Sequence, residues 1–252
     1  MGGFCVLRAS AFSAIAASLL ALVAPAVRAQ SGDGFLYRRP NATLTLRGGY
    51  DRALAGSDIF RDFTNRLTLD RGDFAAPSIG ADVAFTVADR VDLVLSSAYA
   101  RRTRGSEYRH FVATDDTPIA QRTTFLRVPV TAIARYYVAP RGTRVGTFAW
   151  VPTRFAPYVG VGAGSTWYRL RQEGEFLNES SLRTFFGNVQ SSGWATTGVG
   201  TAGIDVSFSP RFLVTTEARY QFARASLSDD FRGYAPADLS SVSLTAGLAV
   251  RF

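Results

Sequence analysis

The last twelve residues of the chain, Ser241–Phe252, read SVSLTAGLAVRF, and the fold can be inferred from their pattern. The even positions are apolar: Val242, Leu244, Ala246, Leu248, Val250 and Phe252. The odd positions carry Ser, Thr, Gly, Ala or Arg. A period of two residues indicates a β-strand with one apolar face and one polar or small face.

The same alternation recurs in seven earlier segments, so the sequence predicts eight strands. They are Thr43–Asp51, Ser78–Val87, Val91–Ala100, Arg122–Val138, Phe155–Arg169, Gly193–Phe208, Arg211–Arg224 and Ser240–Phe252. Short connections such as Ala88–Arg90 alternate with long ones such as Arg52–Pro77, although Ala139–Arg154 is long where a short turn is expected. We expect Ala139–Arg154 to extend the flanking strands. Long loops at one end and short turns at the other are typical of outer-membrane barrels. The predicted fold class is therefore all-β, an eight-stranded antiparallel transmembrane β-barrel over residues 43–252.

The N-terminal segment is interpreted as an export signal. Arg8 is followed by an apolar run, Ala9–Ala24, and then by small residues up to Ala29. A basic start, a short apolar run and a small-x-small end define a signal peptide, here residues 1–29, cleaved before Gln30 or at Ala24-Pro25-Ala26. A retained anchor is the alternative, but the run is shorter than the ~20 residues of a spanning helix. Residues 30–42 are then a periplasmic leader segment, and the expected location is the bacterial outer membrane.

Composition narrows the functional classes. Of 252 residues, 47% are hydrophobic and 19% charged, which excludes a disordered chain. The single Cys and single His leave little for disulfides, metal sites or acid–base chemistry, so no metal and no cofactor is expected. The chain contains no Lys, and its 28 basic residues are all Arg. The net charge of +8 would suit a nucleic acid, but the arginines are not clustered as such a footprint requires.

Charged residues within the strands fall mainly on the face opposite the apolar stripe. Those expected to form a charge network in the barrel lumen are Arg47, Asp82, Arg127, Arg135, Asp205, Glu217 and Arg219. The interior of an eight-stranded barrel can be filled by side chains, and buried charges must be paired, so we expect a plugged lumen. A wide porin is excluded, because porins use ~16–18 strands. A narrow conduit for small or hydrophobic solutes is the alternative.

A soluble β-sandwich would also show alternation. Aromatic residues near the ends of the apolar faces favour a lipid-facing band with aromatic girdles instead. The expected girdle residues are Tyr50, Tyr99, Trp167, Trp194, Tyr220 and Phe222 at the loop end, and Tyr136, Phe208, Phe212 and Phe252 at the short-turn end. Five further outward residues lie just beyond the loop-end girdle: Arg52, Arg101, Arg122, Arg169 and Arg224. We interpret them as a ring that contacts lipid headgroups, in particular lipopolysaccharide phosphates. Arginine also snorkels at any membrane interface, which is the alternative.

The C-terminus resembles the assembly signal of outer-membrane barrels, with Leu248, Val250 and Phe252 at alternate positions. The eight-strand layout resembles the small outer-membrane barrels, namely the OmpA transmembrane domain, OmpX and OmpW types. Pro157–Gly164 (PYVGVGAG) and Leu126–Val130 (LRVPV) are similar to strand motifs of this superfamily. The resemblance implies escort by periplasmic chaperones and insertion by the barrel-assembly machinery.

An enzyme is not expected. His110 precedes Asp115 and Asp116 in one long loop, and Asp229-Asp230 lies in another. Such residues could form a catalytic pair across loops, but polar loop residues often show such spacing by chance. The predicted function is therefore a structural or surface-binding role for a monomer embedded in outer-membrane lipid and lipopolysaccharide. The OmpW-like conduit stays open as the alternative.

Overall fold

The computed structural model describes residues 34–112, 117–178 and 183–252, so the predicted signal peptide lies outside the described residues. The principal strands are β1 (Ala42–Ala53), β2 (Ala76–Ala88), β3 (Val91–Val112), β4 (Pro118–Tyr137), β7 (Phe155–Asn178), β8 (Arg183–Ser207), β9 (Phe212–Ala225) and β11 (Ser241–Arg251). The smaller elements are α2 (Asp58–Arg66), η2 (Arg71–Phe74), β5 (Gly142–Val145), β6 (Ala149–Pro152), η3 (Asp229–Phe231) and β10 (Ala237–Asp238).

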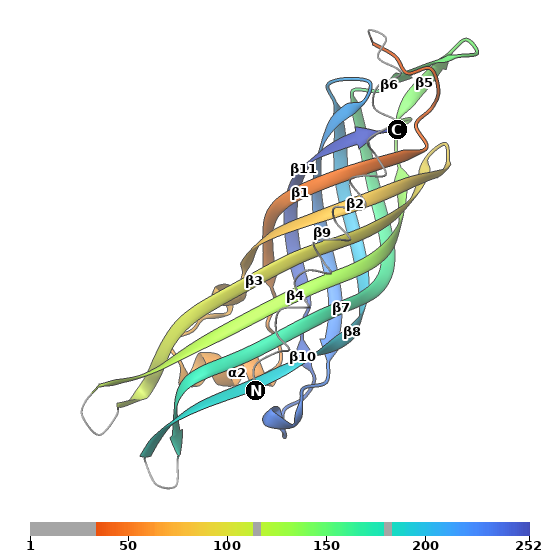
Figure 1. The fold of residues 1–252 in the computed structure, drawn as a ribbon. Helices are drawn as coiled ribbons and strands as arrows, with labels where there is room; N and C mark the ends of the chain where they lie inside the picture. Colours follow the sequence, from red (N-terminus) through yellow and green to blue (C-terminus); the bar gives the residue numbers. More distant parts are fainter. Residues whose placement is uncertain (1–33, 113–116, 179–182) are drawn as a thin grey trace, which may run out of the picture.

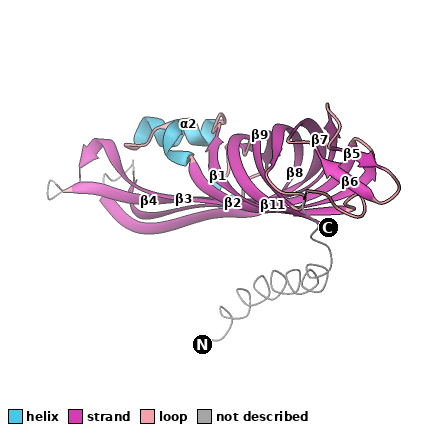
Figure 2. Ribbon diagram, turned by 90° about the horizontal axis from the view of Figure 1, so that it is seen from above, coloured by secondary structure: helices cyan, strands magenta, loops and turns pink. Residues whose placement is uncertain are grey.

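The eight principal strands close into a barrel (Figures 1 and 2). Each pairs antiparallel with the next along the chain, and β11 returns to pair with β1. Thr43 lies opposite Arg251 and Ala53 opposite Ser241, so the first and last strands match over their full length. Closure leaves no unpaired edge within the barrel, which is the condition for a sheet to cross lipid. The predicted eight-stranded antiparallel barrel is confirmed.

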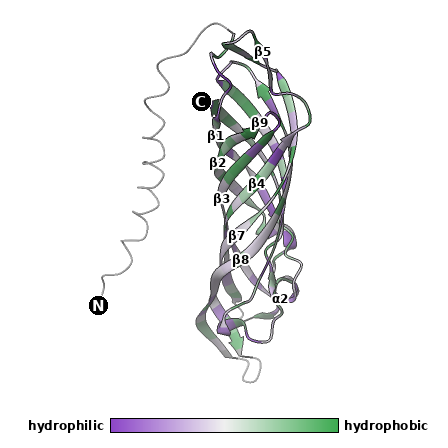
Figure 3. Cartoon of the chain, turned by 90° about the vertical axis from the view of Figure 1, so that its right-hand side faces the viewer, coloured by the Kyte–Doolittle hydropathy of each residue, from purple (hydrophilic) through white to green (hydrophobic). Residues whose placement is uncertain are grey.

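The alternation in sequence becomes an apolar outer surface and a polar interior. Leu46, Ile79 and Leu248 are each more than half exposed, whereas the neighbouring Thr45 and Asp82 are buried. Figure 3 shows the same alternation of hydrophobic and hydrophilic residues along the barrel strands. The residues predicted for the two aromatic girdles are all exposed or half-buried on the outside. A soluble sandwich would bury this apolar face, so the band is the surface that lipid covers.

Four strands are longer than predicted. β3, β4, β7 and β8 continue beyond the barrel, through residues 101–112, 118–126, 169–178 and 183–192, to form what we call the projecting sheet (Figure 1). β1, β2, β9 and β11 end much earlier. The apolar stripe fades in these extensions because polar residues such as Arg122, Arg171 and Glu173 take its place on the outer face. The inner face still carries the buried Ile119, Phe125 and Leu170. For that reason the period-two signal ended too soon.

The long connection 139–154 does not extend the flanking strands, so that expectation was wrong. It forms the separate hairpin β5–β6 at the short-turn end, where the buried Trp150 exchanges two backbone hydrogen bonds with Leu36. Pro129 lies within β4, where the missing N–H of proline can cause a β-bulge, but β3 and β4 show no register shift at this point. Ser97 opposite Val130 and Ala100 opposite Arg127 keep one register, and only the ladder contacts between these pairs are missing. The missing N–H of proline therefore interrupts the ladder without shifting it.

Candidate functional site

A chain of buried ion pairs crosses the middle of the lumen. Arg47 of β1 contacts Asp82 of β2 (Nε–Oδ2, 3.1 Å), and Arg219 of β9 contacts the neighbouring Glu217 (Nη2–Oε1, 2.7 Å) and, more distantly, Asp82 (3.9 Å). Arg135 of β4 reaches across to Glu217 (Nη2–Oε2, 3.2 Å). These five residues are 3–7% exposed. Their period-two positions on β1, β2, β4 and β9 direct all five side chains inward, and pairing satisfies charges that would be costly to bury alone.

Neutral side chains complete this network. Ser96 of β3 accepts hydrogen bonds from Arg47 Nη2 (3.0 Å) and Arg219 Nη1 (2.8 Å) through its Oγ. The Tyr158 hydroxyl donates to Glu217 Oε2 (3.0 Å), and the Arg135 guanidinium lies 4.2 Å from the centroid of the Tyr158 ring. Planar guanidinium groups suit such stacked and forked contacts. The network is therefore a filled layer across the barrel.

Two residues predicted for this network lie apart from it. Arg127 pairs with Asp51 (Nη2–Oδ2, 3.2 Å) nearer the loop end. Asp205 accepts a hydrogen bond from the Tyr137 hydroxyl (2.9 Å) nearer the short-turn end. Within the expected network, Arg127 is thus paired with an acid outside the predicted set, Asp51, an inward residue of β1. Period two gives the face of a residue, but the partner across the lumen depends on strand register and tilt.

The hairpin β5–β6 lies over the short-turn end of the lumen. Arg141 reaches inward to Asp92 (Nη1–Oδ2, 2.7 Å), and its guanidinium lies 4.6 Å from the centroid of the Tyr137 ring. Arg251 lies over the Trp150 ring at 5.6 Å. The short-turn end is thus covered by polar and cation–π contacts, which the strand pattern gave no reason to expect.

The loop end is covered by an apolar lid, which we define as the two connections 54–75 and 226–240. The first contains α2 and η2, and the second contains η3 and β10. Its buried core joins lid residues to the inner faces of the barrel and of the projecting sheet. The core residues are Ala53, Ala55, Ile59, Phe60, Phe63, Leu67, Leu69, Phe74, Phe125, Tyr168, Leu170, Ala195, Ala223, Ala225, Phe231, Ala237 and Leu239. The Phe60 ring packs edge-on against Phe74 (4.8 Å between centroids) and Phe125 (5.5 Å). Figure 1 shows α2 and β10 at this end, beside the projecting sheet.

Polar contacts tie the two halves of the lid together. Asp58 accepts a hydrogen bond from the Ala235 N–H (2.9 Å), and the Tyr234 hydroxyl donates to Asp62 (2.8 Å). The Ala235 N–H holds the pKa of Asp58 below its ordinary value. Burial, with the hydrogen bond to Asp62 as a smaller cause, raises the pKa of Tyr234 to about 12. Both contacts join the loop before β2 to the loop before β11.

The five predicted headgroup arginines, Arg52, Arg101, Arg122, Arg169 and Arg224, are all exposed on the outside. The Arg169 guanidinium lies 5.0 Å from the Trp167 ring, and that of Arg224 lies 5.5 Å from Phe222. In the register, Leu126 lies opposite Arg101 on one side and Arg169 on the other. Leu126 is only 9% exposed although it belongs to the outer face. Two arginines therefore flank one covered apolar position.

The predicted assembly-signal residues lie where β11 meets β1. Leu248 is 64% exposed on the lipid face, and Val250 and Phe252 are half-buried. The Phe252 backbone donates to Ala42 O (2.9 Å) and accepts from Asn41 N (2.7 Å). The C-terminal residue thus takes part in closing the barrel.

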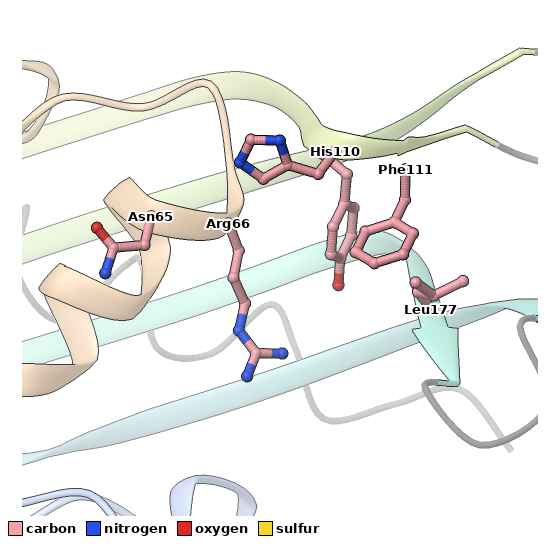
Figure 4. A pocket seen from close by; sticks show the side chains of 6 residues that line it. Asn65, Arg66, His110, Phe111 and Leu177 are labelled. Atoms are coloured by element: carbon pink, nitrogen blue, oxygen red, sulfur yellow. The ribbon is translucent and has the colours of Figure 1, made fainter.

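A pocket of about 120 Å³ opens at the outer end of the molecule, between α2 and the projecting sheet. It is lined by Asn65 and Arg66 from α2, by Tyr108, His110 and Phe111 from β3, and by Leu177 from β7. Figure 4 shows Arg66 on one side of the pocket and Phe111 and Leu177 on the other. Sequence reasoning considered His110 only for catalysis and missed this pocket, because α2 was not predicted.

The proposed catalytic partners of His110 do not assemble among the described residues. Asp115 and Asp116 lie outside the described residues. Asp229 pairs with Arg232 (3.1 Å), and Asp230 accepts from the Gln190 N–H (3.1 Å). The part of the chain that the structure describes contains no group of three or more His, Cys, Asp or Glu placed to hold a metal ion. Within the same residues, no helix is long and apolar enough to cross a membrane.

The closed barrel, the apolar outer band with its girdles and the polar filled lumen define a small β-barrel of the outer-membrane type. No protein-family model matches the chain, and no curated protein matches it in sequence. Among solved structures, the chain is similar to outer membrane protein OprG from Pseudomonas aeruginosa, with 15% identity over 85% of this chain and 97% of that chain and a TM-score of 0.47. It is also similar to Neisserial surface protein A (11%, 84% and 97%, TM-score 0.46) and to Ail of Yersinia pestis (13%, 85% and 100%, TM-score 0.44).

Proposed function

We propose that this chain is a monomeric, non-conducting outer-membrane barrel whose activity lies at its outer surface. The ion-pair layer across the lumen, Arg47–Asp82–Arg219–Glu217–Arg135, is the observation that carries the proposal. The apolar lid above this layer and the hairpin β5–β6 below it add two further obstacles to solutes. An eight-stranded barrel filled in this way leaves side chains where a channel would need water.

Planar-bilayer recordings test this proposal directly. The refolded chain from Gln30 to Phe252 should insert without conductance steps, with insertion checked by heat-dependent gel mobility. Reproducible steps that change in size with Arg135→Gln would contradict the proposal and favour the narrow conduit for small solutes. Arg144→Gln, which removes an exposed arginine of the hairpin, is the matched control.

We further propose that the outward arginines bind the phosphates of lipopolysaccharide. Guanidinium groups bind phosphate through paired hydrogen bonds, and Arg101 and Arg169 flank the covered Leu126 in a fixed arrangement. Arg169→Gln should weaken retention of lipopolysaccharide by the purified barrel about 3- to 10-fold, as one lost charge-assisted contact implies. Equal losses for Arg169→Gln and the control Arg144→Gln would indicate unspecific snorkelling instead.

The same proposal includes the route of assembly. The half-buried Phe252 and the exposed Leu248 support recognition by the barrel-assembly machinery after periplasmic chaperone escort. Phe252→Ala should slow insertion in the presence of that machinery and leave spontaneous folding into detergent nearly unchanged. Equal slowing in both settings would count against a recognition signal.

A further inference from the structure

The hairpin β5–β6 has one face turned toward the lumen and one exposed apolar face. Arg144 lies opposite Trp150, so these two residues share one face, and Val145 and Val151 share the other. Trp150 is buried, and Arg251 lies over its ring at the short-turn end of the lumen. Val145 and Val151 are both exposed. The apolar face of the hairpin therefore points away from the lumen.

The turn of the hairpin adds a large aromatic side chain to this surface. Phe148 lies between the two short strands and is 74% exposed. At the base of the hairpin, Val138 follows β4 and Phe155 begins β7, and both are exposed on the outside. The apolar surface of the hairpin thus continues the lipid-facing band of these two strands, at the end of the barrel opposite α2 (Figure 1). Exposed apolar patches of this kind mark contacts with a protein or a membrane.

Two exposed arginines lie at the base of the hairpin, beside the outward apolar residues. The Arg154 guanidinium lies 5.5 Å from the centroid of the Phe155 ring. Arg90, in the turn between β2 and β3, donates through Nη1 to Val138 O (3.4 Å). The segment 139–154 contains no Asp or Glu. The base of the hairpin is therefore basic as well as apolar.

Charge and composition together favour one kind of partner. Asp89, the acid next to Arg90 in the chain, forms an ion pair with Arg39, so the charges of Arg90 and Arg154 remain in excess. Anionic lipids attract arginines at a membrane surface, and aromatic and aliphatic side chains enter the same interface. A soluble anion would account for the arginines but not for the apolar face beside them.

We propose that the hairpin β5–β6 is a second membrane contact, on the periplasmic leaflet. Val145, Phe148 and Val151 enter the lipid interface, and Arg90 and Arg154 bind the phosphates of anionic phospholipids. The short turns of outer-membrane barrels lie on the periplasmic side, which assigns the leaflet. This inference goes beyond the proposed activity at the outer surface and depends neither on lipopolysaccharide nor on a closed lumen.

Spin labels on single cysteines test the apolar contact. The only Cys of the chain is Cys5, so the refolded chain 30–252 has none. In vesicles of phosphatidylcholine and phosphatidylglycerol, a label on Phe148→Cys should collide with oxygen more than with a water-soluble nickel chelate. Val161→Cys, in the lipid-facing band, should behave alike, and Arg144→Cys, on the opposite face of the hairpin, should show the reverse. A Phe148→Cys label as open to nickel as the Arg144→Cys label, or one shielded from both reagents, would overturn the proposal.

The phosphate contact is tested in the same vesicles with a fluorophore on Phe148→Cys. Brominated phosphatidylglycerol should quench it about 2- to 5-fold more strongly than brominated phosphatidylcholine at equal content, because basic residues concentrate anionic lipid near the hairpin. Adding Arg154→Gln should lower this ratio about 2-fold, whereas Arg144→Gln, on the other face, should leave it nearly unchanged. Equal quenching by the two lipids, or equal losses for the two arginine variants, would contradict the phosphate contact. The vesicles contain no lipopolysaccharide, so the result is independent of the outer ring.

Discussion

The middle of the lumen and its loop end are closed by opposite means. In the middle, five charged residues on four strands are buried together and are joined by ion pairs and by hydrogen bonds to Ser96. At the loop end, seventeen buried residues of the described chain form an apolar core between the lid and the strands that it covers. The first closure is built into the strands and cannot move without breaking the barrel. The second is built largely from loops and can be loosened separately.

Removing a central acid should have the largest effect. Glu217→Ala leaves Arg135 and Arg219 without their shared partner in a buried layer. The free energy of unfolding of the barrel should fall by about 4 kcal/mol, because an unpaired buried charge is costly. The change in the free energy of unfolding can be measured by denaturant unfolding followed by gel mobility.

Glu107→Ala, an exposed acid of the projecting sheet, should leave the free energy of unfolding nearly unchanged. Amide exchange of α2 should also be unaffected by Glu217→Ala if the two closures are independent. Simultaneous loss of α2 protection would show that the middle layer and the lid unfold together.

The second-largest effect is expected from a substitution that loosens the lid. Phe60→Ala removes a ring that contacts both Phe74 and Phe125, and it should weaken docking of the lid by about 3 kcal/mol. Amide exchange on α2 should therefore become about 100-fold faster, while unfolding of the barrel stays the same. Phe186→Ala, at a 79% exposed position, is the matched control. A barrel destabilised as strongly as the lid would argue against two separable closures.

A smaller effect is expected at the junction of the two loops. Tyr234→Phe removes the hydrogen bond to Asp62, which should weaken the lid by about 1 kcal/mol and speed exchange on α2 about 5-fold. The raised pKa of Tyr234, about 12, predicts that its contribution is complete below about pH 10 and is lost as the pH rises to about 12. Ultraviolet titration of the wild type minus Tyr234→Phe should show this late ionisation. A difference curve centred near pH 10 would contradict it.

The weakest effect should appear in acid. The pKa of Asp58 is lowered by the Ala235 N–H, so its contribution to the lid is present above the ordinary carboxyl pKa, near pH 4, and is lost below it. Exchange on α2, corrected for the intrinsic rate, should therefore quicken as the pH falls from 5 toward 3, values chosen to bracket about pH 4. Asp58→Asn should remove most of that dependence. An unchanged profile in the variant would assign it to another group.

The two closures also differ in how far sequence could predict them. The inward faces of Arg47, Asp82 and Glu217 follow from period two, which the lipid and the lumen enforce on every strand. The pairing of Arg127 with Asp51 could not be predicted, since it depends on the register and tilt of strands distant in sequence. The period of two residues therefore predicts whether a side chain points into the lumen, but it does not predict which residue that side chain contacts.

The period-two pattern does not predict the lid, because the segment Arg52–Pro77 lacks that pattern and is expected to be a loop. A signal was present there. Apolar residues repeat there at helical spacing, namely Ile59, Phe60, Phe63 and Leu67. Phe60 and Phe63 are buried on the side of the helix that faces the loop end of the barrel. A helix of nine residues is too short to be stable alone and depends on the barrel wall for its apolar partners. The pocket at Arg66 and His110 depends in turn on that helix, so it could not be predicted either.

Because the strands differ in length, the barrel is much taller on its β7–β8 side than on its β1–β11 side. β7 and β8 contain 24 and 25 residues, whereas β1 contains 12 and β11 contains 11. At roughly 3.3 Å per residue, the two longest strands extend about 40 Å further along their own direction. A large molecule that approaches from the β1–β11 side meets short strands, whereas one that approaches from the β7–β8 side meets the projecting sheet. Neighbouring proteins in a crowded membrane would therefore meet a different steric barrier on each side of this barrel.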